Sequence, residues 1–124
     1  MTKRILIVED QEDNRAILRD VLSRAGYDLI EAFNGEDAVR LAQNEQPDLI
    51  LMDIQLPGID GFEATRRIKA IIDLKSIPII AVTSYALSGD EAHARASGCD
   101  AFVAKPFSPR ELLARVREYF PDAA

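Results

Sequence analysis

Cysteine and tryptophan are almost absent from this chain, which has one cysteine, Cys99, and no tryptophan among its 124 residues. A single cysteine cannot form a disulfide within the chain, and such scarcity favours a reducing compartment. We expect Cys99 to be either a small buried hydrophobic residue or a residue at a helix end. Long apolar runs are also missing, because Ile5–Val8 stops at Glu9-Asp10 and is too short for an export signal or a membrane span. These absences predict a cytoplasmic protein.

An excess of positive charge is absent as well. The chain has 15 Lys and Arg against 21 Asp and Glu, which gives a formal net charge of −6. Binding to nucleic acid and docking on anionic membranes both depend on Lys and Arg, so the composition argues against both. Hydrophobic residues make up 48% of the chain and are spread evenly. The length and this pattern predict one globular domain over residues 1–124.

Two hydrophobic periodicities alternate five times along the chain. Short apolar runs of strand length occur at Ile5–Val8, Leu29–Ala32, Leu49–Met52, Ile79–Val82 and Ala101–Ala104. The first, third and fourth runs are apolar on both faces, which is typical of a parallel sheet covered by helices on either side.

Amphipathic helices are predicted between and after these strands. The first has the apolar stripe Ile17, Leu18, Val21, Leu22 and Ala25 before Gly26, and the second has Ala38, Val39, Leu41 and Ala42 before Pro47. The third opens at Asp60 with Glu63 and ends near Ile72, the fourth opens at Ser88 with Glu91 and ends at Gly98, and the fifth opens at Ser108-Pro109 and ends before Pro121. Five βα units predict an α/β fold with a doubly wound, five-stranded parallel sheet in the flavodoxin-like order 2-1-3-4-5.

Polar residues collect where the predicted strands end, and ligands of such sheets bind at that edge. Glu9 and Asp10 follow the first strand, Asp53 the third, Thr83 the fourth and Lys105 the fifth. The first and third strands are neighbours in the predicted order, so the three carboxylates would repel one another unless a cation lay among them. Mg²⁺ favours oxygen ligands, and a carboxylate beside it can attack phosphorus to form an aspartyl phosphate. Lys105 and Thr83 would supply a positive charge and a hydrogen-bond donor to the transferring group.

These motifs resemble the receiver domains of two-component response regulators over nearly the whole chain. The resemblance rests on Ile7-Val8-Glu9-Asp10, on the run from Pro47 to Gly61 around Asp53, on Ala81-Val82-Thr83 and on Lys105-Pro106. It implies a signalling switch, not an enzyme with a separate substrate, which catalyses its own phosphorylation and dephosphorylation. Asp53 would be the phosphoacceptor, and Mg²⁺ would be held by Glu9, Asp10, Asp53 and the main-chain carbonyl of Gln55. Thr83 and Lys105 would contact the phosphoryl oxygens, and the Lys105–Pro106 peptide bond would be cis.

The resemblance also implies a conformational switch and a set of partners. Phe102 lies three residues before Lys105, where receivers keep an aromatic ring that turns inward on activation. Many receivers have tyrosine there, and phenylalanine lacks the hydroxyl. The expected phosphodonor is a histidine kinase or a histidine phosphotransfer protein, and the expected output surface is formed by the fourth helix, the strand Ala101–Ala104 and the fifth helix. The protein would be a monomer or a weak homodimer, and Ile54, Gln55, Ser84 and Tyr85 would tune hydrolysis of the phosphate.

Stand-alone receivers of the DivK type share further features with this chain. These are Met1-Thr2-Lys3, Asp53-Ile54-Gln55-Leu56-Pro57, Gly89-Asp90-Glu91 and Gly98-Cys99. The resemblance therefore favours a single-domain regulator that acts through protein contacts.

Two other functions stay open at this point. A haloacid-dehalogenase-like phosphatase also uses a strand-end aspartate with Mg²⁺, but it needs a second aspartate two residues later, where this chain has Gln55. A binding module that works without phosphorylation would keep the fold and lose the chemistry.

Overall fold

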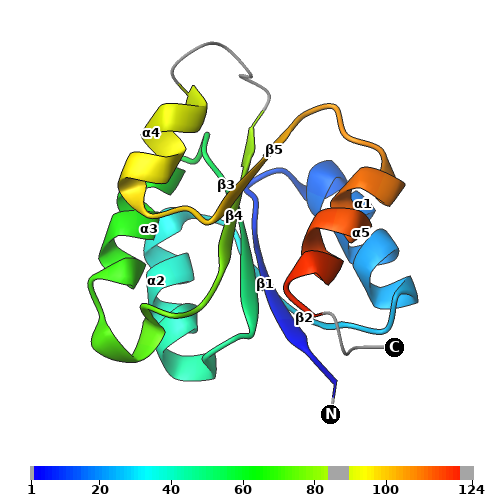
Figure 1. The fold of residues 1–124 in the computed structure, drawn as a ribbon, viewed down its shortest axis with the longest axis horizontal. Helices are drawn as coiled ribbons and strands as arrows, with labels where there is room; N and C mark the ends of the chain where they lie inside the picture. The colour runs from blue at the N-terminus through cyan, green and yellow to red at the C-terminus, as the bar shows by residue number, and fades with distance from the viewer. Residues whose placement is uncertain (1, 84–89, 121–124) are drawn as a thin grey trace.

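Five parallel strands form a single sheet in the computed structural model, which describes residues 2–83 and 90–120. The strands are β1 (Arg4–Val8), β2 (Asp28–Ala32), β3 (Leu49–Asp53), β4 (Ile79–Thr83) and β5 (Ala101–Ala104). They lie in the order β2-β1-β3-β4-β5, and every neighbouring pair is parallel (Figure 1). This order confirms the predicted flavodoxin-like topology.

Helices cover both faces of the sheet. They are α1 (Glu12–Arg24), α2 (Gly35–Glu45), α3 (Gly61–Lys69), α4 (Asp90–Ser97) and α5 (Pro109–Glu118), with a short 3₁₀ helix, η1 (Ile72–Leu74), after α3. Helices α2, α3 and α4 lie on one side, and α1 and α5 lie on the other (Figure 1). No helix in the part of the chain that the structure describes has both the length and the apolar character to cross a membrane.

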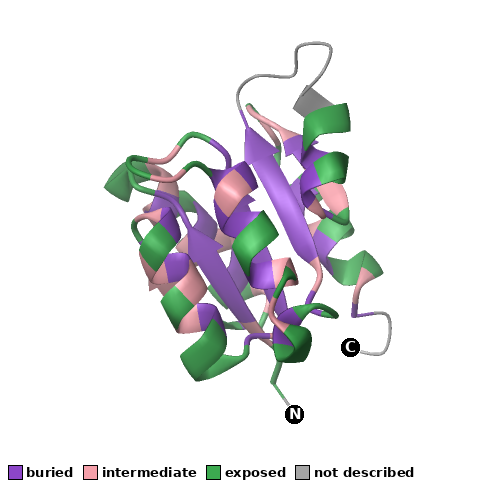
Figure 2. Cartoon of the chain, turned by 90° about the vertical axis from the view of Figure 1, so that its left-hand side faces the viewer, coloured by how far each residue is buried: buried purple, intermediate pink, exposed green. Residues whose placement is uncertain are grey.

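Alternate residues of the central strands supply two separate hydrophobic cores. In β1 and β3, Leu6 and Ile50 pack under α2, α3 and α4, whereas Ile7 and Leu51 pack under α1 and α5. Successive side chains of a strand point to opposite faces, so a strand buried on both sides must be apolar throughout. Figure 2 shows the central strands buried and the outer surfaces of the helices exposed.

Side-chain caps begin two of the helices as predicted. The Asp60 carboxylate accepts a hydrogen bond from the Glu63 N–H at 2.9 Å, and the Ser108 hydroxyl accepts one from the Glu111 N–H at 3.1 Å. These bonds satisfy N–H groups that have no partner within the helix. The predicted start of the fourth helix at Ser88 lies outside the described residues.

Two details of the helix prediction are wrong. The third helix ends at Lys69 and does not reach Ile72, because the chain turns into η1, where Leu74 is buried and Ile72 is 87% exposed. Ile17, which was assigned to the buried stripe of the first helix, is 54% exposed. Leu18 and Leu22 face the core, and Ile17 lies on the flank of α1 that turns toward Lys105 and Phe107.

Candidate functional site

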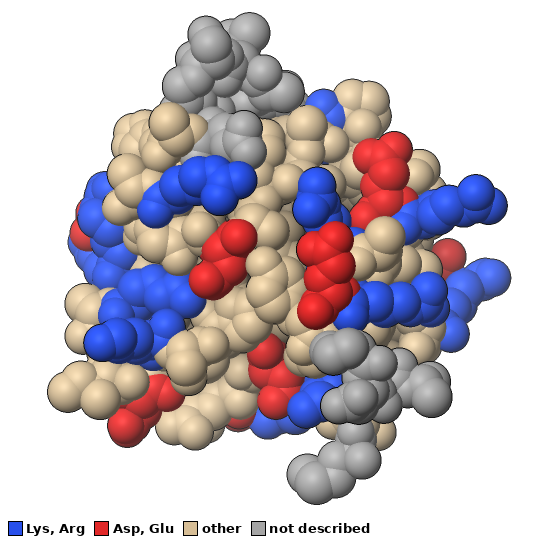
Figure 3. All heavy atoms as spheres, in the orientation of Figure 1, with Lys and Arg blue, Asp and Glu red and all other residues tan. Residues whose placement is uncertain are grey.

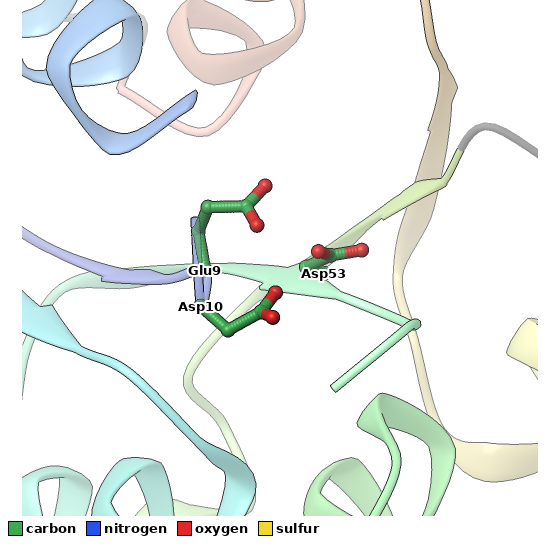
Figure 4. Close-up of side chains that lie close together, drawn as sticks. All are labelled: Glu9, Asp10 and Asp53. Carbon is green, nitrogen blue, oxygen red and sulfur yellow. The ribbon is translucent and has the colours of Figure 1, made fainter. Parts of the chain in front are cut away.

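Three carboxylates meet at the carboxyl end of the sheet. Val8 of β1 pairs with Met52 of β3. The next residues of the two strands, Glu9 and Asp53, therefore lie side by side at the carboxyl end of the sheet. Glu9, Asp10 and Asp53 each offer an oxygen atom, and these oxygens lie within 4.8 Å of one another (Figure 4). Glu9 and Asp53 are buried and Asp10 is exposed. The strand order therefore produces the predicted cluster of acids.

Lys105 is the basic side chain that reaches this cluster from the other half of the sheet. Its ammonium donates a hydrogen bond to Glu9 Oε1 at 2.9 Å and lies 3.6 Å from Asp53 Oδ2. The Lys105 N–H donates to the Thr83 carbonyl at 2.7 Å, and the Lys105–Pro106 peptide bond is cis, the form that the family resemblance implies. Lys105 and Glu9 are 96 residues apart in the chain, so only the sheet brings them together.

The two buried carboxylates experience different electrostatic environments. Burial raises the pKa of Asp53, the negative charge of Glu9 raises it further, and Lys105 only partly opposes them, so that this pKa reaches about 7. Burial also acts to raise the pKa of Glu9, but the hydrogen bond from Lys105 and further hydrogen bonds outweigh it and leave this pKa below its usual value. Lys105 therefore neutralises Glu9 more fully than Asp53, and Asp53 is left without a full counter-charge.

The donor set of this cluster fits a hard divalent cation. All three side chains offer carboxylate oxygens, which are the ligands that Mg²⁺ prefers, and Asp10 faces solvent, which suits an ion that keeps several waters. The backbone after β3 also turns back toward the cluster, because the Gln55 N–H donates to Asp53 Oδ1 at 3.1 Å. Gln55 itself is exposed.

Helix α3 begins directly against the end of β3, next to the site. Gly61 is the first residue of α3, and a Cβ atom built on it would lie 2.3 Å from the carbonyl oxygen of Asp53. No side chain fits in that space, so glycine allows α3 to begin directly against the end of β3. The Gly61 N–H donates to the Ile54 carbonyl at 2.9 Å and ties the helix to the loop after Asp53.

Thr83 and Phe102 lie on the side of β4 and β5. Thr83 ends β4 and is fully buried. Phe102 of β5 is partly buried and lines a surface hollow of about 480 Å³ together with Pro106, Glu111 and Arg115. Ser84 and Tyr85, which were expected to tune hydrolysis of the phosphate, lie outside the described residues.

Arg15 belongs to this site and was missed by the sequence analysis. It lies in the first turn of α1 and is only 7% exposed, and its Nη1 donates to the Glu9 carbonyl at 2.8 Å. An arginine in the acidic segment that follows β1 is normally a solvated residue, so the sequence carries no signal for this contact.

Comparison with known proteins gives a consistent answer. The family described as the response regulator receiver domain matches residues 5–117. The polar-differentiation response regulator DivK of Brucella ovis is 44% identical over 123 residues, which cover 99% of this chain and 100% of that protein.

Solved receiver structures agree with the fold. The receiver domain of a sensor histidine kinase from Pseudomonas aeruginosa PAO1, with a magnesium ion coordinated in its active-site cleft, is 36% identical with a TM-score of 0.91 and covers 98% of this chain and 100% of that one. The chemotaxis response regulator CheY4 of Vibrio cholerae is 27% identical with a TM-score of 0.91, over 96% of this chain and 99% of that one. The family match spans the sheet, the acidic cluster and Lys105, and the chain belongs to the response regulator receiver domains of two-component signalling.

Proposed function

We propose that Asp53 accepts a phosphoryl group from a histidine kinase or a histidine phosphotransfer protein, and that the reaction depends on Mg²⁺. The observation that carries this proposal is the position of Asp53, which is buried at the end of β3 among two further carboxylates and the ammonium of Lys105. Burying more negative charge than the nearby cations neutralise costs free energy of folding. Proteins keep such an arrangement mainly where they bind ions or perform chemistry. The proposal includes the cytoplasmic location and the monomeric or weakly dimeric state predicted from the sequence.

The ligands of Mg²⁺ in this proposal are Glu9, Asp10, Asp53 and the main-chain carbonyl of Gln55. The magnesium ion in the cleft of the Pseudomonas aeruginosa receiver supports this assignment. Bound there, the ion would supply positive charge to the carboxylates and to the oxygens of the phosphoryl group.

The phosphotransfer step uses the carboxylate of Asp53 as the nucleophile. One carboxylate oxygen forms a bond to phosphorus while the bond from phosphorus to the donor's imidazole nitrogen breaks, and that nitrogen leaves with the electron pair. Asp53 must be ionised to attack, and without metal its pKa is raised to about 7. Bound Mg²⁺ would favour the ionised carboxylate and so prepare Asp53 for the attack. Lys105 and Thr83 would stabilise the phosphoryl oxygens by charge and by hydrogen bonding.

The donor protein would approach over an apolar hollow beside the acids. This hollow has a volume of about 490 Å³ and is lined by Glu9, Asn14, Ile17, Leu18, Lys105, Pro106 and Phe107. Glu9 and Lys105 belong to both the hollow and the acidic cluster, so a protein bound here would bring a phosphohistidine close to Asp53. The exposed side chain of Ile17 would contact this partner.

The output surface in this proposal is formed by α4, β5 and α5. A phosphoryl group on Asp53 would carry a charge of about −2 in place of the single charge of the carboxylate, which would draw Lys105 away from Glu9 and allow Phe102 to repack. Figure 3 shows acidic and basic side chains interspersed on the face that carries these elements, so a protein partner would meet charges of both signs. Activation with beryllium fluoride should therefore shift amide signals of α4, β5 and α5, and shifts confined to the site residues would contradict this part of the proposal.

Intact mass spectrometry with acetyl phosphate as the donor tests the central claim. The wild-type protein should gain one phosphoryl adduct with Mg²⁺ and none with EDTA, and Asp53→Asn should gain none. Asp100→Asn is a matched control, because Asp100 lies at the opposite end of the sheet and bonds Lys69 and the Ile79 N–H. An adduct on Asp53→Asn equal to that of wild type would overturn the assignment. No adduct under any condition, with bound Mg²⁺ verified, would favour a binding module that works without phosphorylation.

A further inference from the structure

Arg15 is a buried cation beside the acidic cluster. Its Nη2 donates to Glu12 Oε2 at 2.6 Å, and its Cζ lies 4.0 Å from the centroid of the Phe33 ring. An arginine with its charge out of water is costly unless several partners compensate it. Here the aromatic face, the carboxylate of Glu12 and the carbonyl of Glu9 together provide that compensation.

The carbonyl that Arg15 binds belongs to the peptide unit that joins Glu9 to Asp10. A peptide unit is planar, so the hydrogen bond of 2.8 Å to its oxygen restrains the orientation of the whole unit, and with it the backbone of both acids. Other parts of Glu9 are also held: its N–H donates to the Ala32 carbonyl at 3.1 Å, and its carboxylate accepts from Lys105 at 2.9 Å and from the Gln11 N–H at 3.2 Å. Asp10 is exposed, and its placement depends on the backbone that precedes it.

The guanidinium of Arg15 does not form all the hydrogen bonds that it could. Its Nε is buried without a hydrogen-bond partner among residues 2–83 and 90–120, and lies 3.5 Å from Glu31 Oε1. A buried donor without a partner lowers stability, and such groups in native proteins call for an explanation. Instead, one Nη atom of the guanidinium donates to the Glu9 carbonyl and the other to Glu12. These two bonds join the first turn of α1 to the end of β1.

We propose that Arg15 is a positioning residue for the metal site: it holds the Glu9–Asp10 peptide unit in the orientation that brings both carboxylates toward Asp53. This inference rests on the proposed function, because it assumes that the cluster binds Mg²⁺. Partners that orient metal ligands typically change metal affinity by about 10- to 100-fold when they are removed.

Arg19 provides a matched control on the same helix. Its guanidinium donates to Glu31 at 2.9 and 2.8 Å and to Glu12 at 3.4 Å, so it shares both acidic partners of Arg15. Its hydrogen bonds end on those two side chains and do not include the Glu9 carbonyl. Removing Arg19 therefore changes the charge of this network and leaves the Glu9–Asp10 peptide unit in place.

Isothermal titration with Mg²⁺ separates these cases. It compares wild type, Arg15→Met, Arg15→Lys and Arg19→Met well below their melting temperatures, with circular dichroism to verify folding. Arg15→Met should raise the Kd for Mg²⁺ by about tenfold or more, and Arg19→Met should change it by less than about twofold. Arg15→Lys should lie between them, because a lysine can reach the carbonyl but cannot also stack and bind Glu12 as a planar fork. If Arg15→Met does not fold, Arg15→Lys compared with Arg19→Met decides the question.

Several outcomes would contradict the proposal, and each points to a different error. An unchanged Kd in the folded Arg15 variants would show that Arg15 acts on stability alone. Equal weakening in Arg19→Met would show that the charge of the network matters and the carbonyl contact does not. A positioning role further expects excess Mg²⁺ to restore phosphorylation of Arg15→Met by acetyl phosphate, and failure of this rescue would oppose it. If wild type itself binds no Mg²⁺ and gains no adduct, the proposed function fails, and this inference fails with it.

Discussion

The two ends of the sheet neutralise their charges in different ways. At the amino end, the Asp100 carboxylate accepts hydrogen bonds from the Ile79 N–H at 2.8 Å and from Lys69 at 3.0 Å, and Asp48 accepts from the Arg4 N–H at 2.8 Å. At the carboxyl end, Glu9 and Asp53 share the single ammonium of Lys105.

This difference separates groups that stabilise the fold from groups that make the site. The acids of the amino end have specific donors, as polar groups that only support a structure normally do. The acids of the carboxyl end carry more negative charge than their partners neutralise, and perturbed carboxylates of this kind gather where a protein binds ions or performs chemistry. The comparison predicts opposite effects of mutations at the two ends.

Lys69→Met should produce the largest loss of stability. Lys69 is largely buried and donates to the Ile77 carbonyl at 2.7 Å, to the Lys75 carbonyl at 3.2 Å and to Asp100. Its removal takes this donor from the two carbonyls and leaves Asp100 with the Ile79 N–H but without the ammonium. The free energy of unfolding should therefore fall by about 2–3 kcal/mol in urea titrations. Lys75→Met, a change at an exposed lysine nearby, should cost less than about 0.5 kcal/mol. Loss of phosphorylation in folded Lys69→Met would contradict the proposal that the amino end of the sheet serves stability and the carboxyl end serves the site.

Asp53→Asn should stabilise the metal-free protein, which is the opposite effect. In the folded state the pKa of Asp53 is about 7, above its ordinary value of 3.8. Between these two pH values the folded protein holds a proton on Asp53 that the unfolded protein has lost. The contribution of Asp53 to stability therefore falls as the pH rises from about 4 to about 7. In EDTA near pH 8, the variant should be more stable than wild type by about 1–2 kcal/mol, and near pH 4 the two should be similar. A destabilised variant near pH 8 would mean that the charge of Asp53 is already well compensated.

Mg²⁺ should stabilise the wild type by a smaller amount. At about ten times its Kd, a ligand that binds only the folded state adds about 1.4 kcal/mol to the free energy of unfolding. The gain should shrink below about pH 6, where Asp53 is protonated and a poor ligand. Lys69→Met should keep this increment and Asp53→Asn should lose most of it, as measured by thermal unfolding with Mg²⁺ and with EDTA. An equal gain in both variants would place the ion elsewhere.

The sequence predicted the architecture well, because hydrophobic periodicity and strand-end chemistry are local signals. Each strand was predicted to within one residue at either end, and the missing residues, such as Asp53 in β3 and Thr83 in β4, are polar residues at strand ends. An apolar pattern cannot detect a polar residue that continues a strand. Cys99 is buried and has no disulfide partner, as predicted.

Features that depend on long-range contacts could not be predicted in the same way. The hydrogen bond between Lys105 and Glu9 requires the sheet to exist first. The buried guanidinium of Arg15 requires Phe33 and Glu9 to lie on either side of it, and nothing in the local sequence announces this. His93 is exposed, but its ring also stacks on that of Phe62 in α3 with 4.1 Å between the ring centroids, a contact between helices that sequence periodicity does not encode.

The burial of β3 limits which strands of the sheet can shift. All five of its residues are buried, β1 and β4 lie beside it, and helices cover both of its faces. Because protein interiors are close-packed, such a strand has no direction in which it can move without opening a void or creating an overlap. The edge strand β5 is less enclosed, because Val103 is the one buried residue among its four. In the proposed function, the displacement that follows phosphorylation would therefore occur at the edge strand that carries Phe102, and the central strand would stay in place.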